Sequence, residues 1–254
     1  MPATACEVKV LAHEALAEHI RLMTTSWPRR DKAPRAGQFF MLRCWPIDAA
    51  PLLSRPISLH SYDPLTGTVQ FLYEIKGPGT RMLAALRPGD SLSLTGPSGN
   101  GFPVEHIRGR VALVGGGIGT APLYELAKAL AARGVKADLY CGFRDEPYGM
   151  ERFLPLCGRV FVATDSGRAG FHGLVTELLR PEEYDMALCC GPEPMMRATA
   201  ALCREKGTAC LVSLEKKMAC GVGACLGCTC HTTGGGRSVC KDGPVFNAEE
   251  VFCE

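Results

Sequence analysis

Short runs of alternating apolar and polar residues dominate the first part of the chain, and turn-forming residues separate them. This pattern is typical of antiparallel strands. The clearest runs are 37–43, 55–62, 67–75 and 90–95, whereas only 80–86 has a helical pattern. Pro-Leu-Thr-Gly at 64–67 predicts a tight turn that joins two runs in a hairpin. We therefore predict a closed or nearly closed antiparallel β-barrel over residues 1–108.

The hydrophobic pattern changes at Arg110, after which apolar runs alternate with amphipathic helical patterns. The apolar runs, which predict buried strands, are 111–114, 137–142, 159–164, 186–190 and 209–214. The clearest helix runs from Pro122 to Arg133, because its leucines recur at helical spacing and a glycine follows its end. Alternating strands and helices predict an α/β domain with a parallel, doubly wound sheet, which we place at 109–208. Residues 209–254 are predicted to form a small cysteine-rich module.

Composition limits the class of protein. With 254 residues, 46% hydrophobic and 21% charged, the chain resembles an ordinary soluble multi-domain protein. The formal net charge is +2 and no block of basic residues occurs, so no nucleic-acid partner is predicted. The N-terminal segment has no signal-peptide pattern, and no apolar run approaches the roughly 18–20 residues that cross a bilayer. We therefore expect a cytoplasmic protein without a membrane partner.

Four cysteines near the C-terminus carry the most specific chemistry. Cys220, Cys225, Cys228 and Cys240 stand in the pattern C-x4-C-x2-C-x11-C. These spacings match plant-type [2Fe–2S] ligation, in which four thiolates hold two irons. The residues between them are small and glycine-rich, so the backbone can wrap closely around a cluster and aim N–H groups at its sulfurs. The pattern predicts a one-electron carrier.

Three other interpretations compete for these cysteines. A four-cysteine zinc site uses the same side chains, but usually as two C-x2-C-like pairs, and only Cys225 and Cys228 form such a pair here. A disulfide framework does not suit fourteen cysteines in a chain without a secretory signal. Free buried thiols account for most of the remaining cysteines. Cys230 lies within reach of the predicted cluster, but the register is complete without it, so we leave it out.

A glycine-rich turn joins the first predicted strand of the α/β domain to its first helix. The turn contains Gly115, Gly116, Gly117, Gly119 and Thr120. A doubly wound sheet binds a dinucleotide at such a turn, where helical N–H groups face the pyrophosphate. Thr120 stands where the strict G-x-G-x-x-G motif has its third glycine, and a tight turn without a ligand is the alternative. The strand–turn–helix context favours dinucleotide binding.

Two further loops extend the predicted dinucleotide site. One follows the fourth strand, opens another helix and can reach the nicotinamide end; it consists of Cys190, Gly191 and Pro192. The other follows the second strand, near the expected adenosine ribose. Asp145 or Glu146 could accept a hydrogen bond from the 2′-hydroxyl of NAD, whereas Arg144 could bind the 2′-phosphate of NADP. The residues by themselves leave both cofactors open.

The predicted barrel holds weaker signals. Arg55 and Ser58 place a cation and a hydroxyl three positions apart, although an edge strand with a surface arginine has the same pattern. Residues 75–80 form a glycine turn that could accept an anion, and the glycines at 96–102 could admit a flat ring. Nicotinamide cofactors carry electron pairs, whereas an iron–sulfur cluster accepts one electron at a time. A flavin between them can split the pair, and the barrel is the only place left for it.

These motifs resemble those of the ferredoxin–NADP reductase superfamily, and most closely the electron-transfer subunits of NAD-dependent, two-subunit dihydroorotate dehydrogenases. The resemblance covers essentially the whole chain. The matching segments are RPIS at 55–58, GT at 79–80, GPSGNGF at 96–102, VGGGIGTAPL at 114–123, CGPEPMM at 190–196, SLEKKMACGVGACLGCTC at 213–230 and VCKDGPVF at 239–246. The tail is the most specific of them, and its x11 spacing is on the short side for such proteins.

The resemblance implies an FAD-binding barrel, an NAD-binding α/β domain and a [2Fe–2S] module ligated by the four cysteines. It places the FAD contacts at Arg55, Pro56, Ile57, Ser58, Leu72, Tyr73, Glu74, Gly79 and Thr80. It also implies a partner, an FMN-containing dihydroorotate dehydrogenase catalytic subunit, in a heterotetramer of two copies of each subunit. Electrons would pass from that FMN through the cluster and FAD to NAD, in pyrimidine biosynthesis.

The chain itself shows no convincing substrate site. No Ser/His/Asp set or paired carboxylates stand out, and we interpret His60, His106, His172 and His231 as surface or hydrogen-bonded residues. We therefore predict no catalytic residue of dihydroorotate oxidation in this chain. Two alternatives stay open. One is an FAD and [2Fe–2S] subunit of a transhydrogenase, sulfite reductase or hydrogenase that exchanges electrons with NAD(P)H, and the other is a non-enzymatic zinc-binding adaptor with a nucleotide fold.

Overall fold

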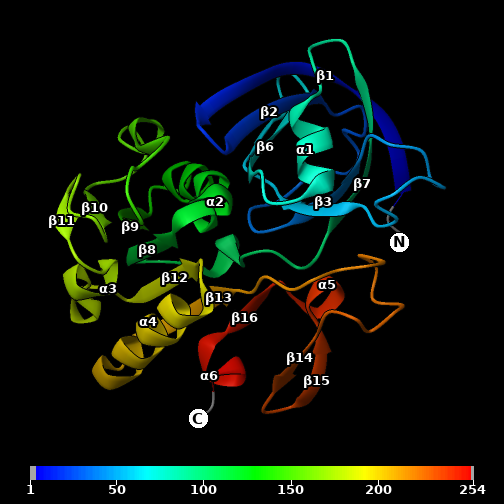
Figure 1. Ribbon diagram of the computed structural model, residues 1–254. Coiled ribbons are helices and arrows are strands. Elements are labelled where there is room, and N and C mark those ends of the chain that lie inside the picture. The colour runs from blue at the N-terminus through cyan, green and yellow to red at the C-terminus, as the bar shows by residue number, and fades with distance from the viewer. Residues whose placement is uncertain (1–3, 253–254) are drawn as a thin grey trace.

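The structure, a computed structural model, describes residues 4–252 and contains two large β-sheets (Figure 1). The first sheet has the order β4-β3-β7-β1-β2-β6-β5, and every neighbouring pair is antiparallel. Its strands are β1 (Thr4–Ala17), β2 (Ile20–Ser26), β3 (Phe39–Arg43), β4 (Arg55–Ser58), β5 (Ser61–Asp63), β6 (Thr68–Glu74) and β7 (Ser91–Ser98). Strand β4 at one edge lies against β6, so the sheet curls into the predicted barrel-like form.

The long strand β1 permits this curvature. Its first half pairs with β7 and its second half with β2, and the register shifts between Val10 and Ala12. Such an irregularity bends a strand and increases its twist. Inside the barrel, the rings of Trp27 and Phe71 meet the Phe40 ring edge-on, with centroids 5.0 and 5.4 Å apart. All three side chains are buried, so aromatic packing fills the barrel.

The predicted turn and helix of the barrel are present. Gly67 has a φ of +68°, and its N–H donates to the Asp63 carbonyl oxygen at 2.9 Å, which closes the hairpin between β5 and β6. Helix α1 (Pro78–Ala84) begins two residues before the predicted start. A proline in the first turn supplies a helical φ there, and the Thr80 hydroxyl accepts hydrogen bonds from two preceding N–H groups.

The second sheet has the order β11-β10-β9-β8-β12-β13-β16 (Figure 1). All neighbouring pairs are parallel except β13 and β16. Its strands are β8 (Arg110–Gly116), β9 (Lys136–Phe143), β10 (Val160–Thr164), β11 (Phe171–His172), β12 (Met186–Cys190), β13 (Ala209–Ser213) and β16 (Val245–Asn247). The predicted strands at 111–114, 137–142, 159–164, 186–190 and 209–214 are all present, so the parallel, doubly wound sheet is confirmed.

Helices cover both faces of this sheet. Helix α2 (Ala121–Ala131) covers one face, and α3 (Val175–Leu178) and α4 (Glu193–Lys206) cover the other. On β8, Val111 and Leu113 pack toward α2, whereas Ala112 and Val114 pack toward α3 and α4. The strand is apolar at consecutive positions because it is buried on both sides. No helix within residues 4–252 is both long and apolar enough to cross a bilayer.

The cysteine-rich segment packs against both sheets. Strands β13 and β16, both within the module predicted at 209–254, extend the parallel sheet. The rest contains a hairpin of β14 (Thr229–Thr232) and β15 (Gly235–Ser238) and the short helices α5 (Val239–Asp242) and α6 (Ala248–Val251). From the barrel, the Asn100 side-chain amide donates to the carbonyl oxygens of Asp242 and Val245 at 2.8 and 3.2 Å. The boundaries 1–108, 109–208 and 209–254 stay a prediction.

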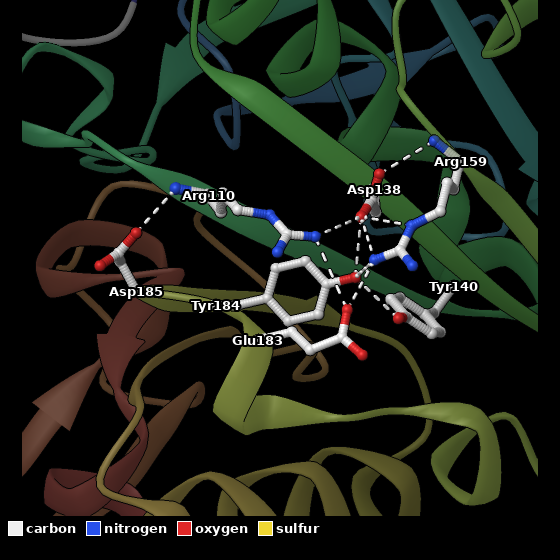
Figure 2. A network of polar contacts seen from close by, with 7 residues as sticks. All are labelled: Arg110, Asp138, Tyr140, Arg159, Glu183, Tyr184 and Asp185. Atoms are coloured by element: carbon white, nitrogen blue, oxygen red, sulfur yellow. Dashed lines mark hydrogen bonds and ion pairs between the residues drawn. The ribbon is translucent and has the colours of Figure 1, made fainter.

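A polar network joins the strands of the second sheet at the edge where they begin (Figure 2). The Asp138 carboxylate on β9 accepts hydrogen bonds from the Arg159 guanidinium at 2.8 and 2.9 Å and from the Tyr184 hydroxyl at 2.9 Å. Arg159 also pairs with Glu183 at 2.9 Å, and Arg110 lies 3.6 Å from both carboxylates. Burial by itself raises the pKa of Asp138, but these hydrogen bonds outweigh it and the pKa is lowered. The network ties the amino ends of the strands together and leaves their carboxyl ends for ligands.

Helix α2 also connects the parallel sheet to the barrel. The Lys128 ammonium donates to the Ser61 hydroxyl at 2.8 Å and to the Tyr62 carbonyl oxygen at 2.9 Å. The same ammonium pairs with Glu125 at 2.9 Å, and the Glu125 carboxylate accepts the Tyr62 N–H at 2.8 Å. One helix therefore holds the β5 edge of the barrel through two side chains that support each other.

His60 lies at this contact and is held neutral. Its side chain is buried, its Nδ1 lies 2.8 Å from the Ala121 carbonyl oxygen, and its ring stacks on Tyr124 with centroids 4.8 Å apart. Because a carbonyl oxygen only accepts, Nδ1 carries the proton. Nε2 has no hydrogen-bond partner within the described part of the chain. Burial lowers the pKa of His60 to about 4, because a charged ring would lose its hydration.

We expect acid to weaken the fold through His60. The unfolded chain binds a proton there near pH 6.5 and the folded protein only near pH 4, so the free energy of unfolding falls as the pH drops between these values. The full shift corresponds to about 3 kcal/mol. On acidification from about pH 7 to about pH 5, the melting temperature of a His60→Gln variant should fall less than that of the wild-type protein. The exposed His106→Gln serves as control, and equal falls in all three proteins would contradict the prediction.

Candidate cofactor-binding cleft

A cleft lies where the barrel, the parallel sheet and the cysteine-rich segment meet. It contains a cavity of about 220 Å³ beside the barrel, the barrel cavity, and a cavity of about 630 Å³ beside the parallel sheet, the central cavity. The residues that line both cavities are Glu74, Lys76, Ile118, Leu214, Glu215 and Lys216. Ligands in the two cavities would therefore share a wall, and their reactive groups could approach each other.

The barrel cavity brings together most of the predicted flavin contacts. The predicted residues that line it are Arg55, Pro56, Ile57, Ser58, Leu72, Tyr73, Glu74 and Thr80. They come from β4, the end of β6 and the start of α1, which the curled sheet places side by side. Gly79 does not line the cavity but lies under Arg55, where a Cβ would come within 2.5 Å of Nε and 2.8 Å of Cζ.

Arg55 offers this cavity a positive charge. Its guanidinium donates to the Leu53 carbonyl oxygen and lies 5.6 Å from the centroid of the Trp45 ring. Within residues 4–252, no carboxylate lies within ion-pair distance of Arg55, in contrast to Lys76, which pairs with Glu74 at 2.9 Å. An arginine without a carboxylate partner at a cavity fits an anionic group such as the pyrophosphate of FAD.

Two predicted flavin contacts have hydroxyl groups that the protein itself engages. The Tyr73 hydroxyl lies 2.9 Å from His13 Nε2, and burial raises the pKa of Tyr73. The Thr80 hydroxyl accepts the N–H groups of Lys76 and Gly77 at 2.9 and 3.0 Å and donates to the Gly77 carbonyl oxygen at 3.1 Å. Those two N–H groups, predicted to be available to an anion, are therefore occupied. Tyr73 and Thr80 shape the cavity wall instead of presenting free donors.

The loop at 96–102, predicted to admit a flat ring, has a different neighbour. A Cβ on Gly99 would come within 2.6 Å of Pro244, and the Asn100 N–H donates to the Gly243 carbonyl oxygen at 2.7 Å. None of the seven residues lines the barrel cavity. The loop instead attaches the cysteine-rich segment to the barrel.

The glycine turn after β8 packs backbone against backbone on the loop after β12. A Cβ on Gly119 would overlap the Cys190 carbonyl oxygen and come within 2.5 Å of Gly191 Cα. A Cβ on Gly116 would come within 2.7 Å of Pro192. Residues with side chains are excluded from such close approaches. The parallel pairing of β8 with β12 brings these two predicted loops together.

These loops stand between the central cavity and a third cavity of about 420 Å³, the outer cavity. Gly116, Gly117 and Pro192 line both. A dinucleotide crosses such a turn at its pyrophosphate, so the central cavity fits the nicotinamide half and the outer cavity fits the adenosine half. Thr120 is buried, and its hydroxyl donates to the Gly117 carbonyl oxygen at 2.9 Å. Thr120 packs against Gly115 and so stabilises the turn.

Asp165 lines the outer cavity with Arg144, and sequence reasoning missed it. It directly follows β10, whose carboxyl end lies beside that of β9, so its carboxylate can accept a hydrogen bond from a ribose hydroxyl. Asp145 and Glu146, the residues considered for that role, do not line the cavity, and Glu146 lies 3.9 Å from Arg168. The available signal was the position of Asp165 at the end of the strand predicted at 159–164.

The four predicted ligands lie together as two pairs of thiols. Backbone contacts link Cys220 to Cys225 and Cys228 to Cys240, because the second residue of each pair directs its N–H at the sulfur of the first. Backbone N–H groups point at the sulfurs: Val222 and Cys225 at Cys220 Sγ at 3.5 and 3.4 Å, Gly223 at Cys240 Sγ at 3.1 Å, and Cys240 at Cys228 Sγ at 3.4 Å. The Val222 N–H is the main cause that lowers the pKa of Cys220 to about 6. The backbone therefore favours thiolate, the form that binds metal.

This arrangement fits a [2Fe–2S] cluster better than a zinc ion. Two irons that each take two thiolates match two pairs of cysteines. A four-cysteine zinc site usually takes its ligands from two C-x2-C-like pairs, and only Cys225 and Cys228 form such a pair here. The described cysteines are free thiols, which argues against a disulfide framework. Cys230 is buried on β14 and lines the central cavity with His231.

The comparisons with known proteins agree with this geometry. Residues 215–252 match the family described as the iron-sulfur cluster binding domain of dihydroorotate dehydrogenase B. The chain is 46% identical to the electron transfer subunit of dihydroorotate dehydrogenase B (NAD(+)) from Clostridium acetobutylicum, across 86% of either chain. It is 40% identical to the subunit of the same name from Caldanaerobacter subterraneus subsp. tengcongensis, across 97% of this chain and 98% of that one.

Solved structures share the architecture. The NADH-dependent reduced ferredoxin-NADP oxidoreductase, studied for flavin-based electron bifurcation, matches with a TM-score of 0.86 and 29% identity, over 96% of this chain and 89% of that one. A ferredoxin NADP+ reductase from Neisseria gonorrhoeae with bound FAD and NADP shares the fold, with a TM-score of 0.67 and 21% identity over 81% and 92% of the two chains. Because the curated relatives match at 40% identity and above over most of its length, this chain belongs to the family of electron transfer subunits of dihydroorotate dehydrogenase B.

Proposed function

We propose that this chain carries electrons between NAD and a catalytic partner subunit that oxidises dihydroorotate to orotate with its own FMN. The carriers within this chain are FAD and a [2Fe–2S] cluster. The two kinds of subunit form a heterotetramer, two copies of each, in the cytoplasm, and the reaction serves pyrimidine biosynthesis. The observation that carries the proposal is that the barrel cavity, the central cavity and the cysteine-rich segment meet in one cleft.

The residues of the barrel cavity would hold FAD. Arg55 would form charge-assisted hydrogen bonds to the pyrophosphate, since no carboxylate in the described chain competes for its guanidinium. The β4 segment 55–58 and residues 72–74 of β6 would contact the ring system. When bound, the flavin supplies the ability to exchange electrons in pairs with a nicotinamide and singly with a cluster.

The two loops at the carboxyl edge of the parallel sheet would hold NAD. The backbone of Gly116, Gly117 and Gly119 leads into the N-terminus of α2, and the positive end of a helix dipole there would favour a pyrophosphate. The nicotinamide would lie in the central cavity, next to the wall shared with the barrel cavity. Asp165 would accept the 2′-hydroxyl of the adenosine ribose in the outer cavity, which favours NAD over NADP.

The four cysteines would ligate the cluster with one side toward the surface. Cys225 is exposed, whereas Cys228 and Cys240 are buried. Val222 and Leu226, which flank Cys225, are 46% and 65% exposed. An electron therefore has a short path from the Cys220–Cys225 side of the cluster to a protein docked there. The Cys228 and Cys240 side of the cluster would be enclosed by protein.

A second candidate function is that of an FAD and [2Fe–2S] subunit in another NAD(P)H-linked complex. The close structural match to the NADH-dependent reduced ferredoxin-NADP oxidoreductase favours it. The identity of 46% to a dihydroorotate dehydrogenase subunit, against 29% to that oxidoreductase, favours the first function. A zinc-binding adaptor is supported least, because residues 215–252 match the family described as an iron-sulfur cluster binding domain.

Replacement of Cys225 by Ser should remove the cluster and leave the flavin. The variant should lose most of its inorganic sulfide and fail to pass electrons to or from the partner, because one iron loses a thiolate ligand. NADH-dependent reduction of a small dye through FAD should persist in part. Cys230→Ser is the matched control and should keep its iron and inorganic sulfide. If Cys225→Ser retains full sulfide content, Cys225 is not a ligand.

Replacement of Gly79 by Ala should weaken FAD retention, because the new Cβ would push the Arg55 guanidinium away from the cavity. We expect the dissociation constant for FAD to rise about tenfold, the loss expected for one charge-assisted hydrogen bond. Gly77→Ala is the matched control, since nothing lies within 4 Å of its Cβ and its φ is −155°. Flavin content after dialysis measures the effect, and equal retention in the two variants would refute the assignment of Arg55.

Replacement of Asp165 by Asn should shift the cofactor preference. Without the carboxylate, the ribose hydroxyl of NADH loses a charged acceptor and the 2′-phosphate of NADPH meets less repulsion. The ratio of kcat/KM for NADH to that for NADPH should fall about tenfold. Asp145→Asn, which lies outside the outer cavity, should keep the wild-type ratio. The reverse result, a shift in Asp145→Asn alone, would move the ribose site to the loop after β9.

A further inference from the structure

Glu215 lies where the two cofactor cavities meet. It follows β13 by two positions and lines both the barrel cavity and the central cavity. Among the charged residues on this shared wall, Glu74 and Lys76 form an ion pair at 2.9 Å. Within the described residues, by contrast, the Glu215 carboxylate has no ion pair and no side-chain hydrogen bond. A carboxylate between a flavin and a nicotinamide therefore stands without a direct partner.

The surrounding charges do not compensate Glu215. Lys76 attracts it, but the Glu74 carboxylate that Lys76 already binds repels it. Lys216 follows it in sequence and is exposed. Behind it the Cys190 thiol is buried, and the charge of Glu215 adds to the burial that raises the pKa of Cys190. The remaining titratable or charged residues around the central cavity are Glu193, Arg197, Cys230 and His231, and Glu193 pairs with Arg197 at 3.0 Å.

The surroundings of Glu215 raise its pKa above the usual range of a glutamate. The Glu215 side chain is exposed toward the cleft and lines both cavities, while nearby protein atoms limit the hydration of its carboxylate. Burial raises the pKa of Glu215; the attraction of Lys76 lowers it, and the repulsion of Glu74 raises it further. A ring bound in either cavity would displace water from the carboxylate and act in the same direction as burial. We therefore expect Glu215 to take up a proton when a bound ring beside it gains a negative charge.

We propose that Glu215 couples reduction of the flavin to the uptake of one proton. The inference rests on the proposed function, because it requires FAD in the barrel cavity. A flavin that receives two electrons and one proton becomes an anion, and this charge would face the Glu215 carboxylate. Two negative charges side by side in the cleft would repel each other. Protonation of Glu215 removes the repulsion and so stabilises the reduced flavin.

The reaction balances in both directions. Oxidised FAD and ionised Glu215, with two electrons and two protons, give the anionic reduced flavin and neutral Glu215. When NADH is the donor, its hydride carries both electrons and one proton to the flavin, and solvent supplies the proton for Glu215. When the cluster is the donor, two single electrons arrive and solvent supplies both protons. When a hydride leaves the flavin for NAD, Glu215 returns its proton to solvent.

The midpoint potential of the bound FAD, measured at a series of pH values in the complete protein, tests the proposal. A two-electron couple shifts by 29.6 mV per tenfold change in proton concentration for each proton that it binds. In the pH range where Glu215 is ionised before reduction and neutral afterwards, the wild-type potential should therefore change by about 59 mV per pH unit. The Glu215→Gln variant should change by about 30 mV in the same range.

Two matched variants test the origin of the extra proton. Glu215→Asp keeps a carboxyl group and should restore the steeper dependence. Glu182→Gln removes an exposed carboxylate just before β12, at the opposite edge of the sheet, and should match the wild-type protein. If the midpoint potentials of the wild-type protein and Glu215→Gln have the same pH dependence, the inference is wrong. The proposal that the protein binds FAD is not affected by that result. If the purified protein binds no FAD, the proposed function itself fails.

An infrared measurement decides the question if Glu215→Gln loses its flavin. Electrochemical reduction of the wild-type protein should produce the C=O band of a newly protonated carboxylic acid. The Glu215→Asp protein should show the same band at a shifted frequency, because the acid belongs to a different side chain. A reduced-minus-oxidised spectrum without such a band would overturn the inference.

Discussion

The contact between helix α2 and the barrel determines where every cofactor cavity of this protein lies. The N-terminal end of α2 follows the glycine turn, and Ala121 there accepts the hydrogen bond of His60. Two turns further along, Lys128 binds the β5 edge of the barrel. A helix held at two points cannot tilt without breaking buried hydrogen bonds. The dinucleotide loops are thereby fixed beside the barrel, and the barrel and central cavities share a wall.

In the parallel sheet, the amino ends of the strands stabilise the fold, whereas the carboxyl ends surround the ligand cavities. At the amino edge, the network around Asp138 and Arg159 satisfies its charges internally (Figure 2). At the carboxyl edge, the loops after β8, β10 and β12 carry close-packed glycines and the Asp165 carboxylate, and these surround open cavities. Ligands of open α/β sheets bind at the carboxyl edge. The sheet can thus be rigid at one end while its loops at the other accept a cofactor.

In the cysteine-rich segment, too, some residues attach to the rest of the protein and others form the ligand site. It is too short and too glycine-rich to fold around a core of its own, so it depends on neighbours and on its metal. Strand β16 attaches it to the sheet, and Asn100 attaches it to the barrel. The tertiary attachments leave one pair of thiols toward the surface and bury the other. With nicotinamide, flavin and cluster bound as proposed, paired electrons would become single ones within this cleft.

The sequence alone determined the features that depend on short spacings along the chain. The cysteine register, the glycine turn and the alternation of buried strands with helices follow from local geometry, and all of these elements are present at the predicted places. Asp165, Glu215 and the buried state of His60 were missed because each depends on residues far away in sequence. Sequence periodicity does not specify which loops face each other, and for that reason Asp145 and Glu146 were considered for the ribose instead of Asp165. Only the packing of α2 on the barrel, and of the cysteine-rich segment on both sheets, decided which side chains share a cavity and which charges are left without a partner.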